Sequence, residues 1–501
     1  MTTYIRRTLC ILFLTCSALA AEDGKYTNDF HGISFRPPAG SQHIPRMGRG
    51  PLAQWVQTQQ RQQTTQLLWS LSLQQNFSKI PKQTLVQLAQ SLETKIRKLP
   101  GGKVTDKTVV QAGPYKVLML EGLTTPRAGT ATKPAESIHF RQAWIKTQPG
   151  TYLTLKLDSI DGQSIATLWN NLWVSLRMVD PTPFRKTLEL QASNAAKFLA
   201  ATSSNTTHAV LDSWPQWFLL EENGRATGWR CLHSKACLRT ITGRIVSPDS
   251  VAGTQKGSQK GFRVRIWSYF LPAGKPKNQA TLAREIIFLA DDNQLESWRT
   301  VKQKGLDQTA ANATSSVIAF DGLRQNNSIV NIVTQGTSVD TQQHRLTAKV
   351  GVCYLPKALN TLLPKLLNRT QPQAYTFTCY DHINDLLTAR TVRVVGPGTV
   401  TVGSIRMRAV KLTDQLDIGL SPRSVWVDPT TGKTLRIDDG TQTSIASDQA
   451  QILAQFSDAL GVIKSLNDAE ARSRKVTTSD DLRPSATQPG QPIRLPGRQP
   501  R

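Results

Sequence analysis

The stretch Ile138–Leu157, which reads IHFRQAWIKTQPGTYLTLKL, sets the expected fold of the first third of the chain. Two runs of strand type, Ile138–Lys146 and Tyr152–Leu157, lie on either side of the turn residues Gln148-Pro149-Gly150. This pattern predicts two antiparallel strands joined by a turn.

Amphipathic helices are expected on both sides of this hairpin. Upstream, apolar residues recur at three- and four-residue intervals between Pro81 and Pro100: Leu85, Leu88, Ala89, Leu92, Ile96 and Leu99. A further strand candidate, Tyr115–Leu123, follows. Downstream of the hairpin, a second apolar stripe consists of Ile165, Leu168, Trp169, Leu172 and Leu176. The order helix, strands, helix predicts an antiparallel sheet with helices packed against it.

These elements resemble the PsbP-like α/β/α sandwich family over about residues 26–180. The resemblance rests on the opening Asp29–Gly40 (DFHGISFRPPAG), the helix after Pro81 and the closing Leu168–Arg177 (LWNNLWVSLR). That family includes a photosystem II extrinsic subunit, a Ran-binding import factor and many exported bacterial proteins. The resemblance implies the sandwich fold and, by analogy, a protein-binding role.

The chain changes character after a helical connector, residues 184–207. Residues 211–466 contain many short strand-like runs and few helical ones, which predicts a β-rich domain with an antiparallel sheet or half-barrel. The runs are Trp217–Leu220, Phe262–Leu271, Glu285–Ala290, Leu295–Val301, Ser328–Val333, Leu346–Val352, Tyr375–Tyr380, Arg390–Val395, Ile405–Leu412 and Ser424–Val427. Helical spacing is confined to Leu355–Leu367 and Ile452–Leu466. The fold class expected for the whole chain is therefore α+β.

One part of this region resembles exported bacterial half-barrel families of the lipoprotein-carrier type. The resemblance covers Thr391–Val402, Ile405–Leu412 and Ser424–Arg436, the last being a hairpin with its turn at Asp428–Lys433. It implies topology only.

The two ends of the chain carry different signals. Residues 1–20 have a basic start (Arg6, Arg7), an apolar run (Leu9–Leu14) and the small-residue site Ala18-Leu19-Ala20, which predicts a cleaved signal peptide and an extracytoplasmic location, periplasmic or secreted. Residues 467–501 are polar and Pro-rich, which predicts a disordered tail.

Four cysteines follow the predicted signal peptide: Cys231, Cys237, Cys353 and Cys379. An even number in an exported chain favours two disulfides. Pairing of Cys231 with Cys237 and of Cys353 with Cys379 is the simplest of three connectivities. The alternative is a four-thiolate zinc site, although the spacings differ from those of such sites.

Charge is the strongest functional signal. The chain has 61 Lys plus Arg against 35 Asp plus Glu, and residues 1–20 hold only two of the basic residues, so +24 belongs to the remainder. Candidate contacts with an anionic partner are Arg46 and Arg49 in one loop and Lys95, Arg97 and Lys98 at a helix end. The alternative is a solvated basic surface. Partners expected from charge are an anionic envelope component, a protein or, peripherally, a membrane. A nucleic-acid module is not expected, because no helix-turn-helix, zinc-finger or RNP pattern is present.

Motifs for catalysis and for metals are missing from the sequence. Seven histidines are scattered without the spacing that places two zinc ligands on one helix face. The run Gly419-Leu420-Ser421-Pro422-Arg423 lacks the second glycine of a nucleophile elbow. We therefore predict no metal, no cofactor and no catalytic residue.

Three functions follow from these patterns. The first is an exported, non-enzymatic binding or envelope-associated protein. The second is a carrier of an apolar ligand in the β-rich region, suggested by Trp267, Tyr269, Phe270 and Trp298, for which a packed core is the alternative. The third is a hydrolase of wall polymer whose acids are brought together only by the fold.

Overall fold

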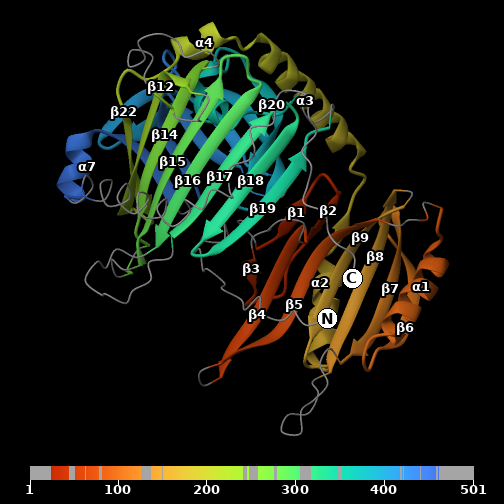
Figure 1. Ribbon diagram of the computed structural model, residues 1–501. Coiled ribbons are helices and arrows are strands. Elements are labelled where there is room, and N and C mark those ends of the chain that lie inside the picture. The colour runs from red at the N-terminus through yellow and green to blue at the C-terminus, as the bar shows by residue number, and fades with distance from the viewer. Residues whose placement is uncertain are drawn as a thin grey trace.

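The computed structural model confirms an α+β protein built on antiparallel sheets (Figure 1). The residues that the structure describes are 24–44, 51–61, 64–77, 80, 82–125, 137–148, 150–240, 245–246, 258–272, 274–275, 279–304, 317–347, 353–417, 420, 422–440, 442–457 and 461. The predicted signal peptide, the predicted tail, Arg46 and Arg49 lie outside them.

The first large sheet has seven antiparallel strands. Their order across the sheet is β3 (Gln42–Ile44), β4 (Ala53–Arg61), β5 (Thr64–Phe77), β9 (Thr151–Ser159), β8 (Ile138–Gln148), β7 (Tyr115–Thr124) and β6 (Lys103–Ala112). The pair β8–β9 is the hairpin predicted from IHFRQAWIKTQPGTYLTLKL.

Two helices cover opposite faces of this sheet. Strand β7 alternates: Val117 packs with the helix α2 (Ser164–Ser175), whereas Leu118 and Leu120 pack with the helix α1 (Leu85–Arg97). The result is three layers, helix on sheet on helix, as predicted. Both helices lie where the apolar spacing placed them.

A capping box starts α1. The Thr84 side chain accepts a hydrogen bond from the Gln87 backbone, and the Gln87 side chain accepts one from the Thr84 backbone, at 3.2 and 3.0 Å. A small sheet of β1 (Tyr26–Asn28), β2 (Ile33–Phe35) and β10 (Arg177–Met178) adds Ile33 and Phe35 to the core beneath α2.

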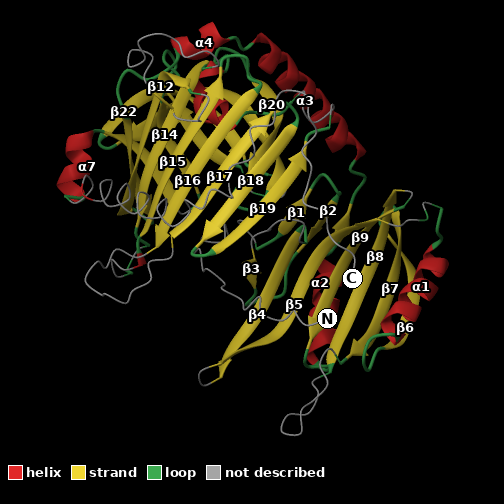
Figure 2. Cartoon of the chain, viewed as in Figure 1, coloured by secondary structure: helices red, strands yellow, loops and turns green. Residues whose placement is uncertain are grey.

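The second large sheet contains fifteen antiparallel strands, which Figure 2 shows in yellow. Its path is β19 (Ser338–Arg345), β18 (Ser328–Gln335), β17 (Val317–Gln325), β16 (Leu295–Lys304), β15 (Thr281–Ala290), β14 (Gln259–Phe270), β12 (Arg225–Arg239), β11 (Gln216–Glu222), β25 (Gln442–Ser447), β24 (Thr434–Asp439), β23 (Arg423–Val427), β22 (Ile405–Gln415), β21 (Leu386–Val402) and β20 (Gln373–Asp381). Strand β13 (Ile245–Val246) pairs with β12.

This sheet curls until its two edge strands approach each other. His344 of β19 bonds to Asp385, which follows β20 and also accepts from the Tyr380 hydroxyl at 2.9 Å. The Asn331 amide donates to the His382 carbonyl at 3.0 Å, and Tyr354 pairs with Thr378 of β20. Figure 1 shows the later strands, in blue, behind the earlier green ones.

The concave face of the curl is filled by a short buried helix, α6 (Lys357–Leu366). Its residues Leu359, Leu362 and Leu363 are at most 1% exposed and belong to the main core cluster with Ile287, Trp298 and Phe377. Outside the sheet, α7 (Gln449–Gln455) places Ile452 against Trp217 and Tyr269. Each face of the sheet therefore has its own core.

The helix α3 (Thr182–Ala201) connects the two sheets, and α4 (Ser204–Ala209) follows it. Near its start, the Arg185 side chain donates to the Phe30 carbonyl at 2.9 Å. Further along, Asn194 donates to the Ala374 carbonyl of β20 at 3.1 Å, and Phe198 packs edge-on against Tyr375 and Phe377.

The sequence pattern missed several strands, among them β4, β6, β17, β19 and β25 and the long strand β12. The fifteen residues of β12 include both Cys231 and Cys237, for which the sequence predicts a disulfide. By contrast, the hairpin at Asp428–Lys433 is confirmed: the Asp428 amide donates to the Lys433 carbonyl at 2.8 Å, and Gly432 adopts the φ of +68° that the turn needs. The predicted strand Leu346–Val352 lies largely outside the described residues.

The prediction of two disulfides is wrong, because all four cysteines are thiols in the structure. Cys231 and Cys237 lie on one extended strand, where six residues span roughly 20 Å, far beyond the reach of a disulfide. The Cys353 sulfur lies 3.6 Å from the Thr378 hydroxyl, while the Cys379 thiol faces the buried core. Burial raises the pKa values of Cys231, Cys237 and Cys379 to about 12.

Reducing agent is therefore expected to leave the melting temperature unchanged. Loss of a native disulfide would cost about 2–5 kcal/mol and lower that temperature visibly. Thermal unfolding with and without reductant measures this. Alkylation under denaturing, non-reducing conditions checks it, because Cys231, Cys237, Cys353 and Cys379 should all be labelled; protection of any pair would contradict the thiol assignment.

Candidate functional site: the concave face of the curled sheet

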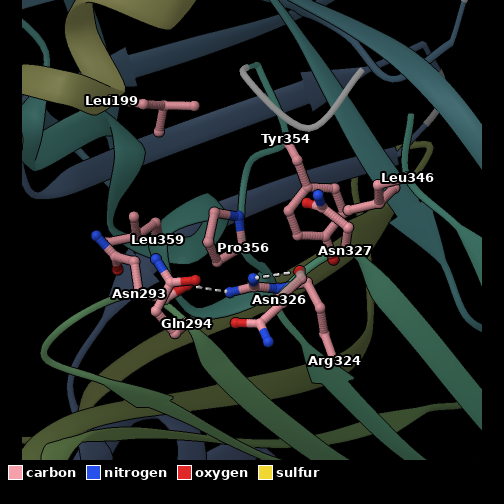
Figure 3. Close-up of a pocket in the computed structure, with 10 residues that line it drawn as sticks. All are labelled: Leu199, Asn293, Gln294, Arg324, Asn326, Asn327, Leu346, Tyr354, Pro356 and Leu359. Atoms are coloured by element: carbon pink, nitrogen blue, oxygen red, sulfur yellow. Dashed lines mark hydrogen bonds between the residues drawn. The ribbon is translucent and has the colours of Figure 1, made fainter. Parts of the chain in front are cut away.

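Polar side chains of two hairpin turns and apolar residues such as Pro356 and Leu359 line a recess of about 220 Å³ beside α6 (Figure 3). The Arg324 guanidinium lies at its base and donates to the carbonyls of Asn293 at 2.7 Å and Asn326 at 3.3 Å. These two residues are the left-handed positions of their turns, with φ of 57° and 52°. Arg324 thus ties the two turns together, and its charge is committed to the fold.

Glu296, beside this recess, acts as the cap of α6. Its carboxylate is 0% exposed and accepts from the Lys357 backbone amide, from the Tyr354 hydroxyl at 3.3 Å and from Arg324 Nε at 3.3 Å. Pro356, the residue before α6, offers no side-chain cap. Burial raises the pKa of Glu296, although Arg324 and Lys357 oppose that effect.

Beyond the apolar core, the inward-facing residues of the strands become charged. Side chains two positions apart on a strand point to the same face, so a residue two positions from an inward core residue also points inward. The pairs of charged residue and core residue are Arg230 and Leu232, Glu285 and Ile287, Arg390 and Val392, Asp414 and Leu412, and Arg423 and Val425. Together with Lys357 and His382, we call these residues the concave charged layer.

Asp414 organises one side of this layer. Its carboxylate is 2% exposed and receives Arg390 through two bonds of 2.7 and 2.8 Å, and Arg423 at 2.7 Å. Burial raises the pKa of Asp414, but the two guanidinium groups outweigh burial and the net shift is downward. Two cations therefore share one carboxylate.

Lys357 and His382 organise the other side. Lys357 Nζ lies 3.2 Å from Glu285 and 2.9 Å from His382 Nδ1, and His382 Nε2 lies 2.8 Å from the Thr300 hydroxyl. An ammonium group only donates, so Nδ1 accepts and the ring proton lies on Nε2. His382 therefore donates to Thr300 and cannot take its proton, which is the reverse of a hydrolase pair.

Acid is expected to destabilise the protein through His382. Burial, and then Lys357, hold the pKa of His382 well below its usual value. Below about pH 6.5 the His382 side chain consequently binds a proton in the unfolded state but not in the folded state. The free energy of unfolding therefore falls by up to about 1.4 kcal/mol for each unit by which the pH is lowered. Urea unfolding at pH 7, 6 and 5 should show a shallower decline for His382→Gln than for the wild type; equal slopes would contradict this account.

Arg230 differs from the other cations of the layer. Lys357 pairs with Glu285, and Arg390 and Arg423 pair with Asp414, but within the described chain no hydrogen bond or ion pair reaches the Arg230 guanidinium. Burial lowers the pKa of Arg230, Arg423 lowers it further, and Glu285 raises it. Arg230 is thus a half-buried guanidinium in the electrostatic field of one cation, Arg423, and one carboxylate, Glu285.

The residues expected to contact an anion lie elsewhere. Lys95, Arg97 and Lys98 are exposed on the last turn of α1, where Arg97 pairs with Glu93 at 2.6 Å. The aromatic residues proposed for an apolar ligand do not share a face: Trp267 and Tyr269 join the outer cluster with Trp229, whereas Phe270 faces inward and Trp298 belongs to the concave core. In the observed conformation α6 fills that core.

No cluster of His, Cys, Asp and Glu able to hold a metal ion occurs among the described residues. None of the helices within the described ranges is long and apolar enough to cross a membrane.

Comparisons with known proteins give weak likenesses. No family model and no curated protein matches the chain. The solved structure of LpqN, involved in cell envelope biogenesis of Mycobacterium tuberculosis, aligns with 29% of this chain and 83% of its own at 15% identity and a TM-score of 0.23. A beta-barrel-like protein of domain of unknown function DUF1849 from Brucella abortus aligns with 47% of this chain and 95% of its own at 13% identity and a TM-score of 0.30. Neither likeness is strong enough to place the chain in a family, and neither shows the PsbP-like resemblance.

Proposed function

We propose that this chain is an exported, non-enzymatic binding protein of the cell envelope that takes an anionic partner. In this proposal the chain has two domains, a PsbP-like domain of residues 26–180 and a β-rich domain of residues 211–466. The observation that supports the proposal is the concave charged layer, where Arg390 and Arg423 share the single carboxylate of Asp414. The reversed polarity of the Thr300–His382 pair argues against a hydrolytic role at that position.

Capture from envelope extract tests the binding function. The chain from residue 21 onward, immobilised, should retain a component at low salt and release it progressively as salt rises, because charge-driven association is screened. An unrelated protein of similar pI serves as the control for nonspecific attraction. Absence of any specifically retained component at every ionic strength would refute the proposal.

Export is tested separately. The full chain should be recovered outside the cytoplasm and shortened at its N-terminus, whereas Leu12→Arg, which places a charge in the apolar run, should keep it inside. Equal distribution of both proteins would remove the extracytoplasmic part of the proposal.

A further inference from the structure

We infer that a groove between the first turn of α1 and the β6–β7 turn of the first sheet binds a fatty acid. Its carboxylate contacts Lys116 and Lys146, and its alkyl chain lies along Val86 and Val109. The groove has a volume of about 420 Å³, and all four of these residues line it. Protein sites for small organic ligands typically have volumes of about 300–1,000 Å³. The groove is separate from the concave charged layer, so the inference goes beyond the proposed function and does not depend on it.

The walls of the groove are apolar and open to solvent. Val86 on α1 is 61% exposed, and Val109 on β6 is 47% exposed. Val109 lies opposite Leu118, which packs with α1, so both side chains are on the α1 face of the sheet. An alkyl chain that covers these two valines removes apolar surface from water, which favours binding.

Two lysines face each other across β7 and β8 in this groove. Val117 pairs with Ile145, so the next residues of the two strands, Lys116 and Lys146, are opposite each other. Opposed side chains in an antiparallel pair have Cβ atoms about 4.5–5.5 Å apart, and like charges there are unfavourable. Lys146 Nζ donates to the Gln83 carbonyl at 2.9 Å, but within the described ranges neither ammonium group pairs with an acid.

The described acids around the groove are engaged elsewhere. Glu93 on α1 pairs with Arg97 and Lys107, both at 2.6 Å. Tyr115 also borders the groove, but its side chain packs in the core cluster of the α2 face. Asp180, whose charge acts on Tyr115, accepts hydrogen bonds from the amide and the hydroxyl of Thr182 at 2.9 and 2.7 Å.

A carboxylate suits this pair of lysines. Each ammonium group is a compact charge that can donate to one carboxylate oxygen, and no guanidinium, whose planar fork matches phosphate, lines the groove. Apolar walls beside a pair of cations require a ligand that is apolar over most of its length and negative at one end. A long-chain fatty acid has this chemistry.

Calorimetric titration of the full chain with dodecanoate, below the concentration at which it forms micelles, tests the inference. Dodecanoate should bind the wild type. Hexanoate should bind at least about thirtyfold more weakly, because it has less apolar surface to place on the valines. Dodecyltrimethylammonium, which has the same chain and a positive head, should bind at least about tenfold more weakly than dodecanoate.

Two pairs of variants locate the binding site. Lys116→Met should weaken dodecanoate binding about fivefold, the effect of one exposed charged contact, whereas Lys103→Met, an exposed lysine at the other end of β6, should bind like the wild type. Val109→Glu, which places a carboxylate in the groove, should weaken binding at least about tenfold. Its control is Val110→Glu, on the same strand but on the opposite face, where Val110 pairs with Val117.

Thermal unfolding of each variant accompanies the titrations. The four substituted side chains are exposed, so all four variants should melt within a few degrees of the wild type. Absence of dodecanoate binding, equal affinity for dodecanoate and dodecyltrimethylammonium, or wild-type affinity in both Lys116→Met and Val109→Glu would overturn the inference. None of these results would affect the capture experiment, which tests the proposed function.

Discussion

Replacing Glu296 by alanine is expected to lower the free energy of unfolding by about 3–5 kcal/mol, because it leaves a buried cation without its counter-ion. Glu296 is fully buried, and its carboxylate meets Arg324, Tyr354 and the first amide of α6. Its loss uncaps the helix that fills the concave core. Thermal or urea unfolding measures the effect, with a drop in melting temperature on the order of 10 °C.

Two variants make the Glu296 experiment specific. Glu296→Gln keeps an acceptor for the Lys357 amide but removes the charge, so its loss should be smaller than that of alanine. Glu189→Ala, on the exposed side of α3, should unfold like the wild type. If Glu296→Ala were as stable as the wild type, the capping role would be wrong.

Asp414→Ala should destabilise the protein by a similar amount, about 3–5 kcal/mol at pH 7, because it leaves Arg390 and Arg423 without the carboxylate that they share. Since the pKa of Asp414 is depressed in the folded state, its contribution is complete above the ordinary carboxyl value near 4 and is lost as the pH falls through the depressed value. Urea unfolding at pH 7, 4 and 3 follows this contribution.

The acid dependence is the control for Asp414. Protonation of Asp414 removes the same negative charge from the wild type that the substitution removes from the variant. The difference in the free energy of unfolding between the two proteins should therefore shrink as the pH falls below about 4. A difference that stays constant from pH 7 to pH 3 would mean that lost packing, and not the lost charge, causes the effect.

The layers of the first sheet could be predicted from sequence because each element has a clear apolar period. Leu85 to Ile96 follow helical spacing and the strands β7, β8 and β9 alternate, so burial and local pattern agree. Strand β12 was missed because its inward face interrupts the apolar pattern with Arg230 and Ser234, and its two cysteines suggested a staple.

The concave charged layer was missed for a different reason. Its members come from five strands, a helix and a turn that are far apart in sequence, and no local spacing links them. A sequence signal for these charges was nevertheless present, because each occupies the same alternate positions of its strand as the inward-facing valines and leucines. Arg390 precedes Val392 and Val394, Asp414 follows Val410 and Leu412, and Arg423 precedes Val425 and Val427. A charge in the apolar register of a strand indicates an inward-facing charge, which the net charge of the whole chain conceals.

The position of α3 determines where this protein can be shortened. The Asn194 side chain donates a hydrogen bond to a backbone carbonyl of the edge strand β20, and Phe198 packs on aromatic residues of that strand. A chain that began at Ser204 would therefore leave the edge of β20 and these aromatic residues exposed to solvent. Such a fragment would tend to pair with copies of itself, and a soluble version of the second sheet should keep the helix from Thr182 onward.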